Sequence, residues 1–66
     1  MELSARNQLN ATVTKVTLGT IMAEVTVDVG GQEIVSAITR GSAERLEEGD
    51  EVTVVIKATE VMLGRE

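Results

Sequence analysis

The feature that most constrains how this chain can fold is the alternation of apolar and polar residues from Ile21 to Val29, in which Met22 is the one apolar residue at a polar position. Successive side chains of a β-strand point to opposite faces, so this stretch presents one apolar face and one mostly polar face. The next two residues, Gly30 and Gly31, can adopt the positive φ angles that a tight hairpin requires. Residues 32–39 then read as a second strand. We therefore predict an antiparallel pair of strands joined by a glycine hairpin.

The residues on either side of this pair predict two more elements. Residues 8–16 alternate in the same way and lead into a turn at Leu18-Gly19-Thr20, which indicates a half-buried first strand. After the pair, Ser42 is placed to cap a short helix over residues 43–46. In that helix the side chain of Leu46 is expected to fill the core.

Two further strands are predicted toward the C-terminal end, over residues 51–58 and residues 60–63. Five short strands with one short helix between strands 3 and 4 is the order of an OB-type Greek-key barrel. We therefore predict an all-β fold of this architecture. No internal repeat or linker divides the chain, so residues 1–66 are expected to form a single domain.

The chain is short for a self-sufficient core, because a domain of 66 residues buries only about 60% of the surface that its unfolded form exposes. It contains neither cysteine nor histidine, which excludes disulfides and soft-metal sites as extra stabilisation. Several apolar side chains fall on the second faces of the predicted strands and would meet water in a monomer: Met22, Val35, Ala37, Val55 and Met62. Because exposed apolar clusters mark interfaces, we expect a homo-oligomer.

Composition argues against several classes of function. The chain has no aromatic residue to stack on a base, and its net charge of −5 opposes association with nucleic acid. Without histidine or cysteine, and with scattered carboxylates, it offers no obvious catalytic centre, so we expect no enzyme activity, no cofactor and no directly bound metal cation. It has no run of about 20 apolar residues, and Met1–Ser4 lacks the features of a signal peptide. We therefore expect a cytoplasmic protein without a membrane partner.

Two segments near the chain ends carry groups that suit an anion. The first, Ser4-Ala5-Arg6-Asn7-Gln8-Leu9, places a hydroxyl, a guanidinium and two carboxamides just ahead of the first strand. The second, Ile56-Lys57-Ala58-Thr59-Glu60-Val61, ends an apolar strand with a lysine and a hydroxyl. An acidic protein can still bind an anion there, because donors close to the ligand outweigh surface charge that is screened beyond about 8–10 Å.

Together with Thr39 and Ser42 between them, these segments resemble the molbindins, small proteins built from the molybdate-binding domain also found in molybdate transporters and regulators. The resemblance runs nearly end to end and implies that the chain binds molybdate. It implies an oxyanion surrounded by the residues that match the family motif: Ser4, Ala5, Arg6, Thr39, Ser42, Lys57 and Ala58. Arg6 and Lys57 would then supply charge, the three hydroxyls would donate hydrogen bonds, and Ala58 would offer its backbone N–H.

The resemblance also implies an assembly. Molbindins form hexamers, in effect three dimers around a threefold axis, with ligand sites between subunits. Similar assemblies have a second kind of site at the threefold axis, built largely of backbone amides, to which the loop Gly19-Thr20-Ile21-Met22 could contribute. Residues next to the motif positions are further candidates for contact with an oxyanion: Asn7, Gln8, Thr20, Ile21, Met22, Arg40 and Thr59.

The leading hypothesis is therefore reversible binding of molybdate, and of tungstate, for intracellular storage or buffering. One alternative is a carrier of an organic molybdenum cofactor, which needs a wider, flatter surface with stacking groups and is disfavoured by the absence of aromatic residues. Another is an OB-type nucleic-acid-binding module, disfavoured by charge and composition. Taken singly, Lys57 also reads as a solvated strand end and Ser42 as a helix cap.

Overall fold

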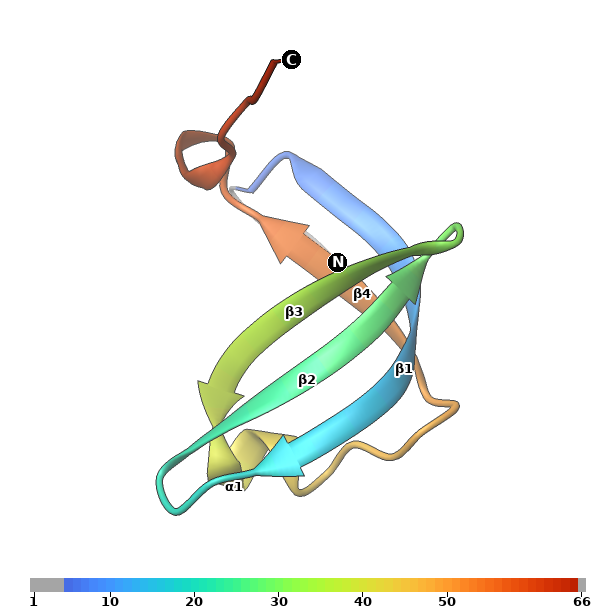
Figure 1. Ribbon diagram of the computed structural model, residues 1–66, viewed down its shortest axis with the longest axis vertical. Coiled ribbons are helices and arrows are strands. Elements are labelled where there is room, and N and C mark those ends of the chain that lie inside the picture. Colours follow the sequence, from blue (N-terminus) through green and yellow to red (C-terminus); the bar gives the residue numbers. More distant parts are fainter. Residues whose placement is uncertain (1–4, 66) are drawn as a thin grey trace.

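The computed structural model describes residues 5–65 and contains one antiparallel sheet (Figure 1). The elements follow in the order β1 (Asn7–Leu18), β2 (Met22–Val29), β3 (Gln32–Thr39), α1 (Arg40–Ala43), β4 (Glu51–Ile56) and the short 3₁₀ helix η1 (Ala58–Glu60). The strand order in the sheet is β3-β2-β1-β4. The predicted all-β class is confirmed, as are the first four strands. The β1 strand extends two residues beyond its predicted end, and β4 stops two residues before the predicted end at Ala58.

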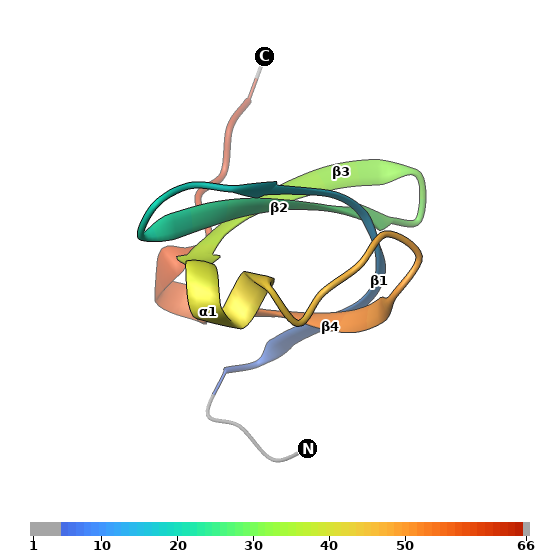
Figure 2. The ribbon, with the colours of Figure 1, turned by 90° about the horizontal axis from the view of Figure 1, so that it is seen from below.

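The β1 strand serves two partners because it is long and bends. Its first half pairs with β4, from Asn7 opposite Ile56 to Thr12 opposite Glu51, and its second half pairs with β2. The register between β1 and β2 shifts between Val13 and Lys15, which is a β-bulge, and bulges bend the strand that carries them. As a result the sheet curls, so that β2 and β3 lie across from β4 with α1 beside the opening (Figure 2).

The glycine hairpin forms as predicted. Gly30 has a φ of 58° and Gly31 a φ of 92°, both in the left-handed region that favours glycine. The pairing of β2 with β3 starts directly beside this turn, with Val29 opposite Gln32, and continues to Met22 opposite Thr39. The two-residue turn therefore sets the register of the whole pair, because a slip by one residue would move the apolar face of β3 to the solvent side.

The core lies on the inner side of the curled sheet and is small. Its buried members are short apolar side chains, of which Val13 is the largest fully buried one: Ala11, Val13, Ala23, Val25, Val27 and Ala43. Leu46 packs against this cluster, as predicted, together with residues of β3 and β4. Because the core is built from alanine and valine, it buries little apolar surface area per residue. Many of the larger apolar side chains lie outside this core and are exposed.

The helix after β3 begins earlier than predicted. The expected cap was Ser42 with a helix over residues 43–46, whereas α1 spans Arg40–Ala43 and its N-cap is Thr39. Thr39 has extended backbone angles, and its hydroxyl oxygen accepts a hydrogen bond from the Ser42 N–H at 3.3 Å. Both residues can cap a helix, and the end of the β2–β3 pairing at Thr39 selects the first of them.

The predicted fifth strand over residues 60–63 is not confirmed within the described chain. Residues 58–60 form η1 instead, and residues 61–65 pair with no strand in the described range. The 3₁₀ turn directs the chain away from the sheet (Figure 1), which leaves Met62 and Leu63 more than nine-tenths exposed. The sheet therefore has four strands, with β3 and β4 as its edges, and the five-stranded closed barrel is not formed within residues 5–65.

An apolar groove of about 300 Å³ remains on the inner side of the sheet between these two edges. It is lined mainly by side chains of β2, β3 and β4 and by Leu46. In a Greek-key barrel a fifth strand occupies the corresponding gap. The groove is therefore the place where the predicted barrel is incomplete.

Candidate functional site

The strands β1 and β4 bring the two predicted cationic residues to the same end of the sheet. Asn7 lies opposite Ile56 in the last registered pair, so Arg6, one residue earlier, and Lys57, one residue later, follow on neighbouring strands. Strands paired in this way lie about 4.8 Å apart. The Asn7 side-chain Nδ2 donates a hydrogen bond to the Ile56 carbonyl at 3.2 Å and ties the two chain segments together here.

Arg6 and Lys57 are both exposed, and within residues 5–65 neither forms an ion pair. Two adjacent positive charges repel each other unless an anion lies between them, and a dianion satisfies both at once. We call the group formed by Ala5, Arg6, Asn7, Lys57 and Ala58 the basic corner. The protein as a whole carries a net negative charge, so the positive charge of the basic corner is a local property of this end of β1 and β4.

Backbone donors adjoin the basic corner. Lys57 is the N-cap of η1 with extended backbone angles and no side-chain capping bond. Because the first N–H groups of a helix have no acceptor inside it, Ala58 and Thr59 present N–H groups beside the two cationic side chains. Gln8, by contrast, directs its Nε2 toward the Ala5 carbonyl at 3.2 Å, which holds the chain ahead of β1. Ser4 lies outside the described residues.

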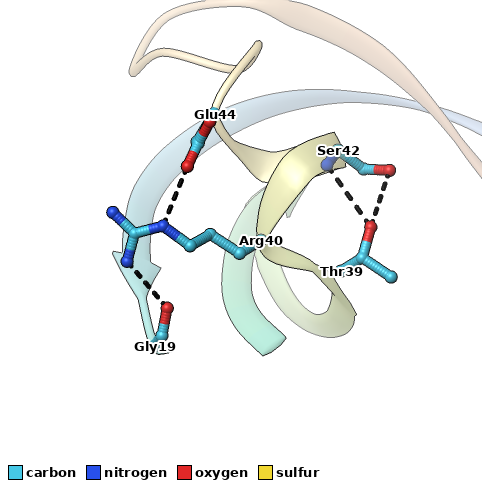
Figure 3. A network of polar contacts seen from close by, with 5 residues as sticks. All are labelled: Gly19, Thr39, Arg40, Ser42 and Glu44. Carbon is cyan, nitrogen blue, oxygen red and sulfur yellow. Dashed lines mark hydrogen bonds and ion pairs between the residues drawn. The ribbon is translucent and has the colours of Figure 1, made fainter. Parts of the chain in front are cut away.

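A second group of predicted residues meets where β3 ends. The Thr39 hydroxyl accepts a hydrogen bond from the Ser42 N–H and donates one to Ser42 Oγ at 3.0 Å (Figure 3). This arrangement leaves the hydrogen of the exposed Ser42 hydroxyl available for an outside acceptor. We call Thr39 and Ser42 the hydroxyl corner.

Arg40 lies between the two hydroxyl residues but turns the other way. Its Nε donates to Glu44 Oε1 at 2.8 Å, and its Nη1 donates to the Gly19 carbonyl at 2.8 Å (Figure 3). The pair with Glu44 is the one ion pair found within residues 5–65. Glu44 was not predicted as a site residue, and Gly19 was named only as part of the loop Gly19-Thr20-Ile21-Met22. The spacing of Arg40 and Glu44, four residues apart, is the signal that could have found the ion pair.

The two corners do not meet within one chain. The basic corner lies at the end of β4 near η1, the hydroxyl corner lies at α1, and Figure 1 shows these elements toward opposite ends of the longest axis, which spans 33 Å. Among residues 5–65 no hydrogen bond or ion pair links one corner to the other. A single chain therefore presents the predicted donors as two separate half-sites.

Other parts of the surface suit an anion less well. A hollow of about 580 Å³ over β1 and β4 includes Asp28 and Glu51 in its lining, and these carboxylates repel anions. None of the predicted site residues lines it. Among the described residues, no group of three or more acidic, histidine or cysteine side chains is arranged to hold a metal ion. Within the same range, no helix is long and apolar enough to span a membrane.

Comparison with known proteins gives consistent results. The sequence model of the TOBE domain matches residues 3–63. The chain is 47% identical to molybdenum-pterin-binding protein 1 of Clostridium pasteurianum over 66 aligned positions. The match covers 96% of this chain and 97% of that protein. It is 41% identical to a probable molybdenum-pterin-binding protein of Haemophilus influenzae over 69 residues, with both chains covered completely. The solved structure of a molybdate-binding protein from Sporomusa ovata matches with a TM-score of 0.93 and 43% identity, covering 98% of this chain and 100% of that one.

Proposed function

Because this chain belongs to the TOBE domain family, whose members compared above are molybdenum-pterin-binding and molybdate-binding proteins, we propose that it binds molybdate reversibly. The observation that carries the proposal is the placement of Arg6 and Lys57 directly beyond the paired residues Asn7 and Ile56 at one end of the sheet. It provides two positive charges and adjacent backbone N–H groups in an otherwise acidic protein.

The chemistry of the ligand matches these groups. Molybdate is a tetrahedral dianion with no proton to give, so it needs several donors and no acceptor. Arg6 and Lys57 donate charge-assisted hydrogen bonds, Ala58 offers a backbone N–H, and Ser4 belongs to the same motif. At the other end of the molecule, Thr39 and Ser42 supply hydroxyls. Contacts from Asn7, Gln8 and Thr59 are part of the same proposal.

The two corners support a site shared between copies of the chain. Since they lie at opposite ends of one molecule, the hydroxyl corner of one copy can complete the basic corner of another only after association (Figure 1). The apolar side chains predicted to lie at an interface are exposed here: Met22 by 48%, Val35 by 60%, Val55 by 40% and Met62 by 92%, and Ala37 is exposed as well. We propose a hexamer built as three dimers.

Association also accounts for the incomplete barrel. The groove between β3 and β4 is apolar, and residues 61–63 carry three consecutive exposed apolar side chains. A strand placed there pairs with both sheet edges and closes five strands into a barrel. We propose that residues 60–63 take up strand structure in the assembled protein.

A carrier of an organic molybdenum cofactor is the second candidate, because the relatives from Clostridium and Haemophilus are named for binding molybdenum-pterin. A pterin ring is bound by stacking, and this chain has no aromatic side chain to stack on it. We therefore favour the bare oxyanion. Storage or buffering in the cytoplasm, binding of tungstate, a single domain over residues 1–66 and the absence of enzyme activity belong to the same proposal.

Equilibrium dialysis followed by elemental analysis tests the proposed function. The protein is dialysed against micromolar molybdate, and molybdenum, phosphorus and pterin fluorescence are measured on both sides of the membrane. Retained molybdenum in a fixed ratio to protein, without phosphorus or pterin, is the expected result. Molybdenum retained only when pterin is present favours the carrier, and no retained molybdenum contradicts both candidates.

A further inference from the structure

We propose that Arg40 is a positioning residue of the oxyanion site and not a ligand of the oxyanion. The inference rests on the proposed function, since it concerns how the hydroxyl corner and the β1–β2 turn are held for binding. Arg40 is attractive as a ligand from the sequence alone, because it is a cation between two hydroxyl residues. Its contacts in the structure assign it a different role.

Arg40 joins α1 to the β1–β2 turn through two separate groups. Its backbone N–H donates to the Ile21 carbonyl at 2.8 Å. Its side-chain Nη1 donates to the Gly19 carbonyl, also at 2.8 Å (Figure 3). Gly19 is 21 positions away in the sequence, and the side-chain bond extends to the turn the contact between these segments that the pairing of Met22 with Thr39 begins.

The contacts of Arg40 determine which backbone groups of the turn remain available. The carbonyls of Gly19 and Ile21 are bound to Arg40, and the Met22 carbonyl accepts from the Gly19 N–H at 2.9 Å. Within residues 5–65, the N–H groups of Thr20 and Ile21 donate to no backbone or side-chain acceptor. The carbonyls of Gly19, Ile21 and Met22 are occupied while the N–H groups of Thr20 and Ile21 are unbonded, so the turn presents donors, as an anion requires.

The guanidinium already donates two hydrogen bonds within the chain, one through Nε and one through Nη1. Its Nε is 2.8 Å from Glu44 Oε1, so a carboxylate already neutralises the charge that an oxyanion would need. Arginine can make this bond and the bond to Gly19 together, because its donors form a rigid planar fork. Lysine carries the same charge as a single point on a flexible stem and cannot reproduce both bonds. The network therefore requires arginine for its geometry and not for its charge alone.

The placement of Thr39 gives the network its effect on the site. Thr39 directly precedes Arg40, and its hydroxyl is held by Ser42 (Figure 3). Anchoring Arg40 at Gly19 and Glu44 thus fixes the hydroxyl corner relative to the turn. When these donors are held in place before binding, less conformational freedom is lost as the anion binds.

Two measurements on the full-length protein test this role. The first is ¹⁵N relaxation of the Thr20 and Ile21 amides without ligand, for which rigid backbone gives order parameters of about 0.85 and flexible backbone values below about 0.6. We expect Arg40→Lys and Arg40→Ala to lower both order parameters. Arg45→Ala removes the same charge from an exposed neighbour on this segment and should leave them unchanged. Unchanged order parameters in Arg40→Lys overturn the proposal, whether or not the protein binds molybdate.

The second measurement is the molybdate dissociation constant by equilibrium dialysis, with folding checked by circular dichroism. Arg40→Lys and Arg40→Ala are expected to bind about tenfold more weakly than wild type, while Arg45→Ala stays near wild type. A direct ligand role predicts the opposite pattern, in which Arg40→Lys retains most of the affinity. If wild type itself retains no molybdate, the proposed function fails, and the relaxation data still decide whether Arg40 holds the turn.

Glu44→Gln separates the two roles further. It removes the charge that neutralises Arg40, so a ligand role for Arg40 predicts tighter molybdate binding. The exposed residue Glu48 provides the control for the change in net charge, as Glu48→Gln. The positioning role expects Glu44→Gln to bind no more tightly than Glu48→Gln. Binding about tenfold tighter than that control overturns it.

Discussion

Replacing Gly19 by alanine should destabilise the protein through a single, identifiable contact. A Cβ atom at this position would lie 2.5 Å from the Met22 carbonyl oxygen, closer than the 3.0 Å that real Cβ atoms respect. That oxygen also accepts the Gly19 N–H hydrogen bond at 2.9 Å, so it cannot move away without lengthening the bond. The added methyl group therefore displaces backbone and not a flexible side chain.

The expected magnitude follows from these two effects. Loss of one backbone hydrogen bond costs about 0.5–1.5 kcal/mol, and a backbone shift forced by overpacking costs about 1–3 kcal/mol. We expect a total near 2 kcal/mol, which for a domain of this size lowers the melting temperature by about 8–16 °C. Thermal unfolding is followed by far-ultraviolet circular dichroism, because no aromatic residue reports it. Protein concentrations must be equal, since association makes the melting temperature depend on concentration.

Gly41→Ala is the matched control for this prediction. A Cβ atom there meets nothing within 4 Å, and Gly41 lies inside α1, where alanine is favoured over glycine. The same chemical change is therefore expected to leave stability unchanged or to raise it by about 0.4–1 kcal/mol. If Gly19→Ala melts at or above the temperature of Gly41→Ala, the turn does not have the geometry described here.

The remaining predictions concern binding and assembly. Arg6→Ala and Lys57→Ala should each weaken molybdate binding about ten- to a hundredfold, the value of one charge-assisted hydrogen bond. The control Arg65→Ala should bind like wild type. Equal titration curves for wild type and all three variants would remove the basic corner from the site. Light scattering at micromolar concentration should detect an assembly larger than a dimer, and a 7.0 kDa particle alone would contradict the shared site. Molybdate at a hundred times its dissociation constant should stabilise the folded protein by about 2.7 kcal/mol per independent site. Phosphate should have less effect, because its proton finds no acceptor in a donor-only pocket; equal shifts with phosphate or sulfate would indicate a nonspecific anion effect.

The strands and the hairpin were predictable because they depend on local order in the sequence. The alternation in β2 and β3 has a period of two, as expected for strands. The two glycines between them adopt the positive φ angles that a tight hairpin requires. The bulge at Val13 was not predicted. It arises because one strand has to serve partners on both sides, and nothing in residues 8–16 states where the change of partner occurs.

The fifth strand predicted over residues 60–63 is not confirmed, because strand formation there depends on a distant partner. An apolar segment becomes a strand only when an edge lies beside it, and the η1 turn carries this segment away from β3 and β4. The start of α1 was misplaced for a related reason. Thr39 and Ser42 are both good caps, and the choice between them follows from where β3 stops pairing with β2.

The residue types of the candidate site could be read from the sequence, and their grouping could not. A guanidinium, an ammonium and hydroxyls at the ends of elements indicate an anion, because their chemistry does not depend on the fold. Their positions do. The register of β1 with β4 brings Arg6 beside Lys57, while the curl of the sheet carries Thr39 and Ser42 to the other end. The role of Arg40 could not be read from the sequence either, because its charge suggests a ligand. Its contacts with Gly19 across the fold and with Glu44 next to α1 are what support a positioning role.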